Sequence, residues 1–402
     1  MIDDKLYFVS VNKVQYNMVK RIAIIGAGPV GLFLAIQLAK SRSCGIDLYE
    51  KRIAYTRRQI VILNARNVNR LPAEVRNKLY GARGEGCFVK PPPSDQSGRC
   101  YVSKGARKLG AIVIRKLEMA LAEYVEGIPN VNIIRKDIGI KNLQDMALDY
   151  DYIFGADGKR SNVRKWMKGK VSRHTTGYGL VMLFNSRKRA LRRTDQIQLH
   201  TQHGMTKDVS QHRFRAFRSQ GKDNYIAIQL QKSEYDTIKK RPSSMSELPA
   251  DLQKTCKEAA KFYGVSLPKN KTDVRISYFP IQLTTTDFIT RQLRGKARVV
   301  IIGDAFMGVN FFSGRGVNIG MDEAVTLARV THGKASMQDF KVQMRGHVKE
   351  REDALGTLNL PRPNKVKKCM KYNKEDHLRT GRKMGKNIKM LSPKNRCMIV
   401  AK

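Results

Sequence analysis

Short runs of apolar residues alternate along the chain with stretches in which apolar residues recur at helical spacing. The apolar runs read as strands and lie at residues 21–25, 46–50, 131–134, 152–154 and 298–302. The helical stretches lie at residues 32–40, 71–80, 112–126 and 320–330. Continuous apolar runs are typical of parallel sheets, whose strands are covered on both faces. The pattern therefore predicts an α/β fold built around a parallel sheet.

Between these runs the pattern changes to an alternation of apolar and polar residues. The strand-like segments lie at residues 179–184, 196–200, 213–217, 225–231 and 274–283, with a helix expected at 248–263. Alternation of this kind is typical of antiparallel sheets. We expect one domain built on the parallel sheet at residues 20–170 and 288–358, and an inserted antiparallel β-sheet domain at 171–287. An N-terminal extension (1–19) and a basic C-terminal tail (359–402) complete the chain.

The charge of the chain bears on which partners the protein could bind. Lysine and arginine number 77 against 34 acidic residues, which gives a formal net charge of +43. Residues 361–402 alone hold 14 basic and 2 acidic residues, and residues 187–193 form a dense basic cluster. Such an excess attracts polyanions, of which nucleic acid and an anionic membrane surface are the usual ones. A generally basic proteome gives the same composition, so both interpretations stay open.

The cysteine pattern and the hydropathy of the chain indicate the cellular compartment in which the protein is expected. The six cysteines are scattered without a C-x-x-C pair, which predicts neither a metal site nor a disulfide framework. No signal peptide and no run of about 18 apolar residues is recognisable. We expect a cytoplasmic protein without a membrane span, with a virion or a nucleic-acid-associated compartment as the alternative.

The clearest motif is G-x-G-x-x-G at Gly26, Gly28 and Gly31, directly after a strand and at the start of a helix. In such a turn the first glycine permits the tight bend, the second lets the backbone approach a pyrophosphate, and the third lets helix and strand pack closely. The helix N-terminus favours the phosphate charge. Glu50 closes the second strand, where a carboxylate accepts hydrogen bonds from ribose hydroxyls. The sequence therefore predicts a dinucleotide site.

Two later motifs indicate which dinucleotide is bound. The sequence Asp-Tyr-Ile-Phe-Gly-Ala-Asp-Gly at residues 151–158 resembles the Asp-Gly motif of the class A flavin monooxygenases, the group of p-hydroxybenzoate hydroxylase. The sequence Val-Ile-Ile-Gly-Asp-Ala at residues 300–305, followed by Gly-Arg-Gly-Val-Asn at 314–318, resembles their Gly-Asp motif. The resemblance implies FAD as the cofactor. It also implies that residues 20–170 and 288–358 form a Rossmann-like FAD-binding domain and that the inserted antiparallel β-sheet at 171–287 is the substrate domain.

The resemblance also assigns residues to parts of the cofactor. It implies that Asp157 and Gly158 lie near the pyrophosphate, and that the motif at Gly303 and Asp304 holds a ribityl hydroxyl through its aspartate. The loop and helix that follow carry Gly314, Gly316 and Asn318, and in the family their backbone N–H groups lie beside the flavin pyrimidine ring. Such dipoles can stabilise the anion of a reduced flavin.

Residues 50–63 and 112–118 are similar to the flavoenzyme domain of the MICAL-type methionine oxidases. This similarity implies that Arg57 and Arg115 contact FAD, a role that suits the planar donor fork of arginine. The alternative is that both are solvated basic residues in a basic protein. The similarity is local and does not imply an actin substrate.

One segment departs from the family pattern. Met307 stands where the family commonly has a histidine, and no proline precedes Gly314. That proline shapes the wall near the flavin at which oxygen reacts. Tyr278 and Phe279 are candidates for the substrate pocket, but they could equally be core aromatics of a strand.

Together these motifs predict an FAD-dependent monooxygenase. The resemblance implies reduction by NADPH or NADH, a flavin hydroperoxide, and transfer of one oxygen atom to a small-molecule substrate, at an aromatic carbon or a thioether. Only one G-x-G-x-x-G is present, so the nicotinamide cofactor would visit without a Rossmann domain of its own. No side chain stands out as a catalytic acid or base. The alternatives are a flavin-dependent reductase and a catalytically degenerate basic flavoprotein that binds nucleic acid in an assembly or virion.

Overall fold

The computed structural model describes two stretches of the chain. They are residues 20–80, apart from 42, and residues 110–358, apart from 187–213, 219–222, 239–241, 263–264, 288, 293–294 and 309–315. The expected N-terminal extension, the basic cluster at 187–193, the expected strand at 196–200, Gly314 and the basic tail lie outside the described residues.

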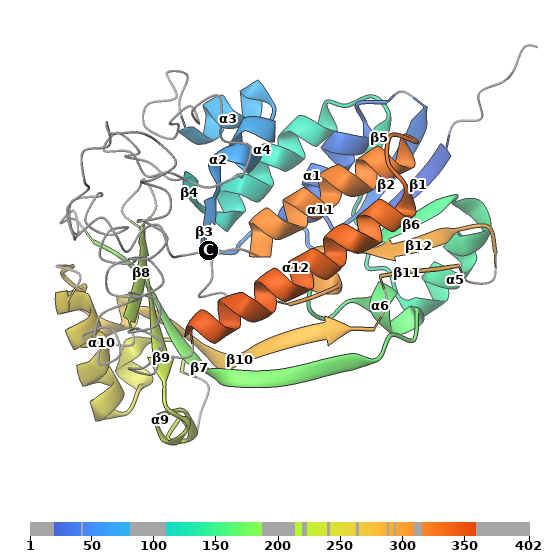
Figure 1. Ribbon diagram of the computed structural model, residues 1–402. Coiled ribbons are helices and arrows are strands. Elements are labelled where there is room, and N and C mark those ends of the chain that lie inside the picture. The colour runs from blue at the N-terminus through green and yellow to red at the C-terminus, as the bar shows by residue number, and fades with distance from the viewer. Residues whose placement is uncertain are drawn as a thin grey trace, which may run out of the picture.

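The larger sheet has six strands in the order β11-β12-β6-β1-β2-β5, and all but the edge strand β11 run parallel (Figure 1). In sequence order the strands are β1 (Lys20–Ile25), β2 (Cys44–Tyr49), β5 (Val131–Ile134), β6 (Tyr152–Gly155), β11 (Thr290–Gln292) and β12 (Arg298–Ile301). Ile22, Ile24 and Val300 are fully buried, as continuous apolar strands require. The α/β prediction is confirmed.

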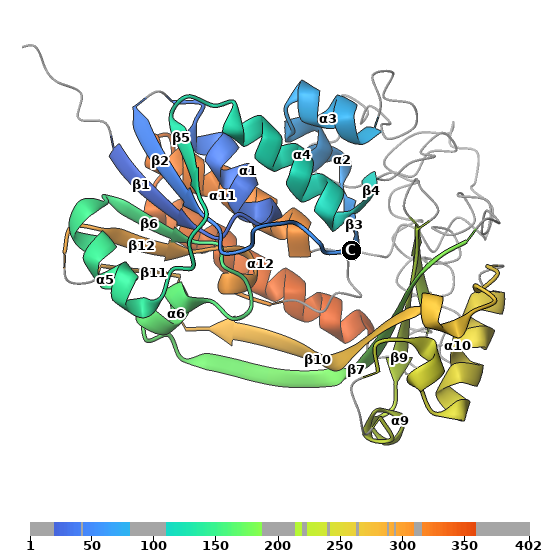
Figure 2. The same ribbon diagram turned by 180° about the vertical axis from the view of Figure 1, so that it is seen from behind.

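Helix α1 (Pro29–Leu38) is the centre of the helical layer. Nine of its ten residues are buried, because α1 lies between the sheet, α4 (Ile114–Glu126) and α11 (Gly316–Thr331). A helix that is apolar on all sides has to be covered in this way. Helix α12 (Met337–Leu358) packs on α11 and runs toward the second sheet, as Figures 1 and 2 show from opposite sides. Helices α5 (Ile140–Asp149) and α6 (Asn162–Trp166) follow β5 and β6.

The second sheet is antiparallel, with the order β10-β7-β9-β8. Its strands are β7 (Val171–Asn185), β8 (Phe214–Arg218), β9 (Asp223–Leu230) and β10 (Arg275–Thr286). Alternate side chains divide between two clusters: Leu180 and Met182 pack with α10 (Ala250–Phe262), and Val181 packs on the opposite face. Short helices complete this region: α9 (Lys232–Asp236), η1 (Met245–Glu247) and η2 (Lys271–Asp273).

A two-stranded ribbon joins the two sheets. It pairs β3 (Ile60–Leu63) with β4 (Gly110–Val113), and Ile60 and Val113 pack against Val181 of the antiparallel sheet. The helix expected at 112–126 begins only at Ile114, because the first two of those residues belong to β4. Helices α2 (Ala65–Arg70) and α3 (Ala73–Tyr80) follow β3.

The antiparallel sheet begins with β7 at Val171 and ends with β10 at Thr286. These bounds agree with the expected insertion at 171–287, although the division into domains stays a prediction. Among the described residues, none of the helices combines the length and the apolar character needed to cross a bilayer.

Candidate flavin site

The three motifs meet at one edge of the parallel sheet. Strands β12, β6 and β1 are neighbours, and each motif begins at or just past the carboxyl end of its strand, at Gly303, Asp157 and Gly26. Backbone hydrogen bonds fix this edge: Ala156 N–H donates to the Ile25 carbonyl at 2.8 Å, and Ile302 N–H donates to the Gly155 carbonyl at 3.0 Å. In open α/β sheets, ligands bind outside the carboxyl ends of the strands.

The glycines of the first motif differ in what surrounds them. Gly26 has φ +104°, and a Cβ there would lie 2.7 Å from the Ala156 carbonyl oxygen. A Cβ on Gly31 would overlap the carbonyl oxygen of Gly26 itself. A Cβ on Gly28 would meet only the Arg57 guanidinium, at 3.7 Å. Gly28 therefore faces open space beneath an arginine, at a helix N-terminus that has no side-chain cap.

Glu50 is buried at the end of β2, and its carboxylate holds the glycine turn in place. The Ala27 N–H donates to Glu50 Oε2 at 3.0 Å, and Arg52 donates to both carboxylate oxygens at 2.9 Å. Burial alone would raise the pKa of Glu50, but these hydrogen bonds outweigh it and hold the pKa below its ordinary value. The expected contact with a ribose stays a prediction.

The structure brings Arg57 and Arg115 together. The Arg115 N–H donates to the Arg57 carbonyl at 3.2 Å, next to the β3–β4 ribbon. The Arg57 guanidinium pairs with Glu118, a fully buried carboxylate of α4 that Arg52 also contacts at 3.2 Å. Arg57 keeps 40% of its side chain exposed, and the Nη2 that pairs with Glu118 is also the atom nearest to the open side of Gly28. Glu118 was not recognised from the sequence.

Asp157 and Gly158 form the turn after β6. Asp157 Oδ2 accepts the N–H groups of Asn162 at 2.6 Å and Val163 at 3.3 Å. Its Oδ1 is buried and has no hydrogen-bond partner among the described residues. Burial raises the pKa of this carboxyl group. Gly158 has φ +77°, and nothing lies within 4 Å of the position of a Cβ. An acceptor atom and an open backbone therefore stand side by side.

Arg164 links the Asp-Gly motif to the Gly-Asp motif. The side chain is buried and donates to the backbone carbonyls of Ala305 at 2.6 Å and Lys159 at 2.5 Å. A longer hydrogen bond of 3.4 Å reaches the backbone carbonyl of Asp304. Burial lowers the pKa of its guanidinium. Sequence reasoning did not single this residue out, because its function is visible only when β6 and β12 lie together.

The Gly-Asp motif forms a short 3-10 turn, η3 (Gly303–Ala305). Gly303 has φ +60°, and its N–H donates to the buried carboxylate of Glu323 at 2.6 Å. Asp304 is half-buried in the same turn, close to the N-terminal half of α11. Its proposed hydrogen bond to the ribityl chain stays a prediction.

Asn318 is held in the first turn of α11, which begins at Gly316. Its Oδ1 accepts the Asn64 N–H at 2.8 Å, and its carbonyl accepts the Asn67 side-chain amide at 2.9 Å. These bonds tie α11 to the start of α2. Gly314 lies outside the described residues, and the proposed contact of this loop with the flavin ring stays a prediction.

The residues that depart from the family pattern fill the core. Phe306 and Met307 are 3% and 0% exposed and belong to the main apolar cluster. Tyr278 is half-buried against the α10 cluster, and its ring centroid lies 5.4 Å from that of Tyr235. Phe279 belongs to the opposite face, beside the β3–β4 ribbon.

These residues fit an FAD molecule. Its pyrophosphate needs open backbone, a helix N-terminus and a cation, which Gly28, α1 and Arg57 provide. Its hydroxyl groups need acceptors, and Asp157 Oδ1 is an acceptor that the described protein leaves unused. Arg57 and Arg52 are already paired with the carboxylates of Glu118 and Glu50, so these four side chains together are close to neutral before the cofactor binds.

The fold and these motifs define a flavoprotein of the class A monooxygenase type. The family model described as "FAD binding domain" matches residues 136–338, which contain the Asp-Gly and Gly-Asp motifs. This match spans half of the chain, so the protein belongs to that family, and FAD is its cofactor. A comparison with curated protein sequences finds no match.

Solved structures share the fold at low sequence identity. The p-nitrophenol 4-monooxygenase PnpA from Pseudomonas putida DLL-E4 has a TM-score of 0.54 and 13% identity, covering 89% of this chain and 93% of its own. PqsL, a probable FAD-dependent monooxygenase from Pseudomonas aeruginosa, has a TM-score of 0.52 and 13% identity, covering 86% and 98%. The Diels-Alderase PyrE3 of pyrroindomycin biosynthesis has a TM-score of 0.54 and 14% identity, covering 95% and 79%. The chain therefore has the fold of these flavoproteins.

Proposed function

We propose that this protein is an NAD(P)H-dependent flavin monooxygenase that acts on a small molecule. The observation that carries the proposal is the meeting of three motifs at neighbouring strand ends, where Gly28 has room on its open side and the Arg57 guanidinium is the nearest group. FAD, when bound there, would take two electrons from NAD(P)H and activate oxygen. The balanced reaction converts substrate, O2, NAD(P)H and a proton into oxygenated substrate, water and NAD(P)+.

The protein's part in this reaction is to bind and orient. Arg57 and the α1 N-terminus would hold the phosphates, and Arg164 keeps the Asp304 backbone in register with the Asp-Gly turn. The first turn of α11 would place N–H dipoles where negative charge develops. No proton-transfer residue is required of the protein by this chemistry.

The substrate side of the site is the antiparallel sheet. Its face toward the β3–β4 ribbon carries Val181, Tyr225, Ile281 and, half-buried, Phe279. Val181, Tyr225 and Ile281 are buried because they pack against the ribbon, so of this set only Phe279 keeps exposed surface for a substrate. An aromatic carbon or a thioether as the oxygen acceptor is what the family resemblance implies. Met307 stands where the family commonly has a histidine and is buried in the main apolar cluster, so this position would offer no imidazole to the flavin site.

The decisive experiment is an anaerobic stopped-flow measurement on the FAD-loaded protein. We expect NADPH or NADH to bleach the oxidised-flavin absorbance, and oxygen to restore it. Reduction without an oxygen-dependent return would instead indicate a reductase. Bound FAD that neither nucleotide reduces would overturn the proposal and favour a non-redox use of this fold.

A matched variant guards against contaminating flavoenzymes. Gly28→Ala adds one methyl group to the phosphate side of the turn, where only Arg57 is near. The variant should purify as a folded protein without flavin and without nucleotide oxidation. Nucleotide oxidation by a preparation of this variant that is shown to contain no flavin would belong to another enzyme.

A further inference from the structure

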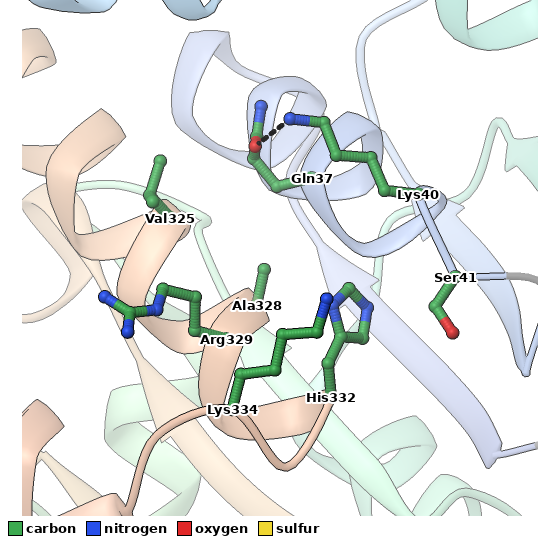
Figure 3. A pocket seen from close by; sticks show the side chains of 8 residues that line it. All are labelled: Gln37, Lys40, Ser41, Val325, Ala328, Arg329, His332 and Lys334. Carbon is green, nitrogen blue, oxygen red and sulfur yellow. Dashed lines mark hydrogen bonds between the residues drawn. The ribbon is translucent and has the colours of Figure 1, made fainter.

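Helix α11 is held differently along its length. A cavity of about 370 Å³ lies between its C-terminal end and that of α1 (Figure 3). Nearer the N-terminus the same two helices touch, because a Cβ on Gly320 would lie 2.5 Å from Val30. The first turn of α11, at residues 316–318, comes before that contact. Packing on α1 therefore holds α11 around Gly320, and hydrogen bonds from α2 and its N-cap reach the turn before it.

Asn67 is the buried centre of these hydrogen bonds. Its side chain lies fully buried on α2, and its Nδ2 donates to the Asn318 carbonyl at 2.9 Å and to Asn318 Oδ1 at 3.4 Å. The same Oδ1 accepts the backbone N–H of Asn64, the N-cap residue of α2, at 2.8 Å. Asn64 Oδ1 in turn accepts the Asn67 N–H at 2.8 Å. The start of α2 and the first turn of α11 are thereby joined by hydrogen bonds.

Arg70 decides which way the Asn67 amide faces. Its Nη1 donates to Asn67 Oδ1 at 2.9 Å and also pairs with the Asp322 carboxylate on α11. A guanidinium group can only donate, so the amide oxygen has to face Arg70 and the NH2 group has to face Asn318. The donor of a fully buried amide is therefore directed at the first turn of α11.

We propose that Asn67 is a positioning residue that raises the reduction potential of the bound FAD. This role rests on the proposed function, in which the first turn of α11 would direct its N–H groups at the flavin. The first N–H groups of a helix have no carbonyl of their own helix to bond, and they carry partial positive charge. Such dipoles stabilise the negative charge of a reduced flavin when they are held in place beforehand. By fixing Asn318, Asn67 holds this turn in place.

Asn67→Leu tests the proposal on the FAD-loaded full chain. Leucine keeps the branched shape of asparagine but cannot donate to Asn318. The Asn318 carbonyl keeps its place in the hydrogen bonds of α11, and Arg70 keeps its pairing with Asp322, so the variant should fold and bind FAD.

The reduction potential is measured anaerobically, with xanthine and xanthine oxidase as the reducing system and a reference dye. We expect the equilibrium between reduced and oxidised flavin to shift about tenfold toward the oxidised form, which is about 30 mV for a two-electron couple. The measurement needs neither NAD(P)H nor oxygen. A protein that no nicotinamide nucleotide reduces would still show this shift, so failure of the proposed function and failure of this role are distinguishable.

Asn69→Leu is the matched control, because it makes the same change at an exposed position of the same helix. Its flavin potential should equal that of the original chain. An unchanged or higher potential in folded, FAD-loaded Asn67→Leu would overturn the proposal, because Asn67 would then be purely structural. An equal shift in Asn69→Leu would overturn it as well.

Arg70→Met carries the test if Asn67→Leu fails to fold or to bind FAD, since the Arg70 side chain is 31% exposed. The change removes the donor that orients the Asn67 amide, so the flavin equilibrium should shift severalfold in the same direction. Arg66→Met removes the same charge from an exposed position on α2 and should leave the potential unchanged. Equal shifts in the two arginine variants would overturn the proposal, because loss of a nearby positive charge would then account for both.

Discussion

Gly28 and Gly31 belong to one turn, yet a methyl group would have different effects at the two positions. At Gly28 the methyl group has room, and φ is −76°, so Gly28→Ala should change the free energy of unfolding by no more than about 1 kcal/mol. At Gly31 it would overlap the Gly26 carbonyl oxygen, so Gly31→Ala should unfold the domain or force the turn apart.

Urea unfolding and flavin absorbance separate these two outcomes. Gly28→Ala should lose FAD with its stability intact, whereas Gly31→Ala should lose both. Retention of FAD by the Gly28 variant would show that the phosphates do not approach this backbone.

Glu118 should be a positioning residue for the flavin arginines. Glu118→Gln removes a buried charge that faces Arg52 and Arg57 and puts an NH2 group where the carboxylate accepted hydrogen bonds. A buried polar group left without a partner costs about 1–3 kcal/mol. We expect lower stability together with about tenfold weaker FAD binding, measured by fluorescence titration.

Glu123→Gln on the same helix is the control for that variant. Glu123 pairs with Lys78 at the surface, where an ion pair contributes about 0–1 kcal/mol. It should leave FAD affinity unchanged. A stability loss in Glu118→Gln with unaltered FAD affinity would reduce Glu118 to a purely structural role.

Local backbone requirements explain which site residues could be found from the sequence. A tight turn after a strand demands glycine, so Gly26 and Gly303, both at positive φ, are visible in the sequence itself. Arg164 and Glu118 act across 141 and 61 residues of chain, and no local pattern encodes such partners. Arg57 and Arg115 were found through family resemblance, and the structure places their backbones in contact.

At the scale of elements, α12 offers a direct test. Phe340 is fully buried against the main core, so Phe340→Ala should cost about 3–5 kcal/mol. Val342 lies two residues on and is 57% exposed, so Val342→Ala should change stability by less than about 0.5 kcal/mol. Chemical denaturation of both variants checks the difference. Equal effects would mean that α12 does not pack on the core as described.

Helices and strands could be predicted from the sequence where their apolar residues form a clear run or recur at a regular spacing. The buried strands of the parallel sheet announce themselves as apolar runs, and the expected bounds of β5 and β12 agree with the structure to within one residue. The 22-residue α12 was missed because most of its residues are polar and its burial depends on α11. The four-residue strands β3 and β4 are too short to show a period.

At the scale of the whole molecule, the net charge of +43 should act against compactness. Raising salt from about 0.01 M to 0.15 M shortens the screening length from about 30 Å to 8 Å and weakens this self-repulsion. The midpoint of thermal unfolding should therefore rise over this range, as measured by circular dichroism. A midpoint that falls would mean that attractive ion pairs outweigh the repulsion.

The long pairing of β7 with β10 has a mechanical consequence. A strand of fifteen residues is about 50 Å long, so the paired strands β7 and β10 form a long, stiff connection between the antiparallel sheet and the flavin domain. This strand pair is held near the C-terminal end of β10, where the backbones of Thr284 and Gly308 exchange hydrogen bonds of 3.0 and 3.2 Å just beyond the Gly-Asp turn. A small tilt of the antiparallel sheet would therefore displace the backbone at Gly308, beside the Gly-Asp turn. Contact between a substrate and that sheet would in this way be transmitted mechanically to the flavin site.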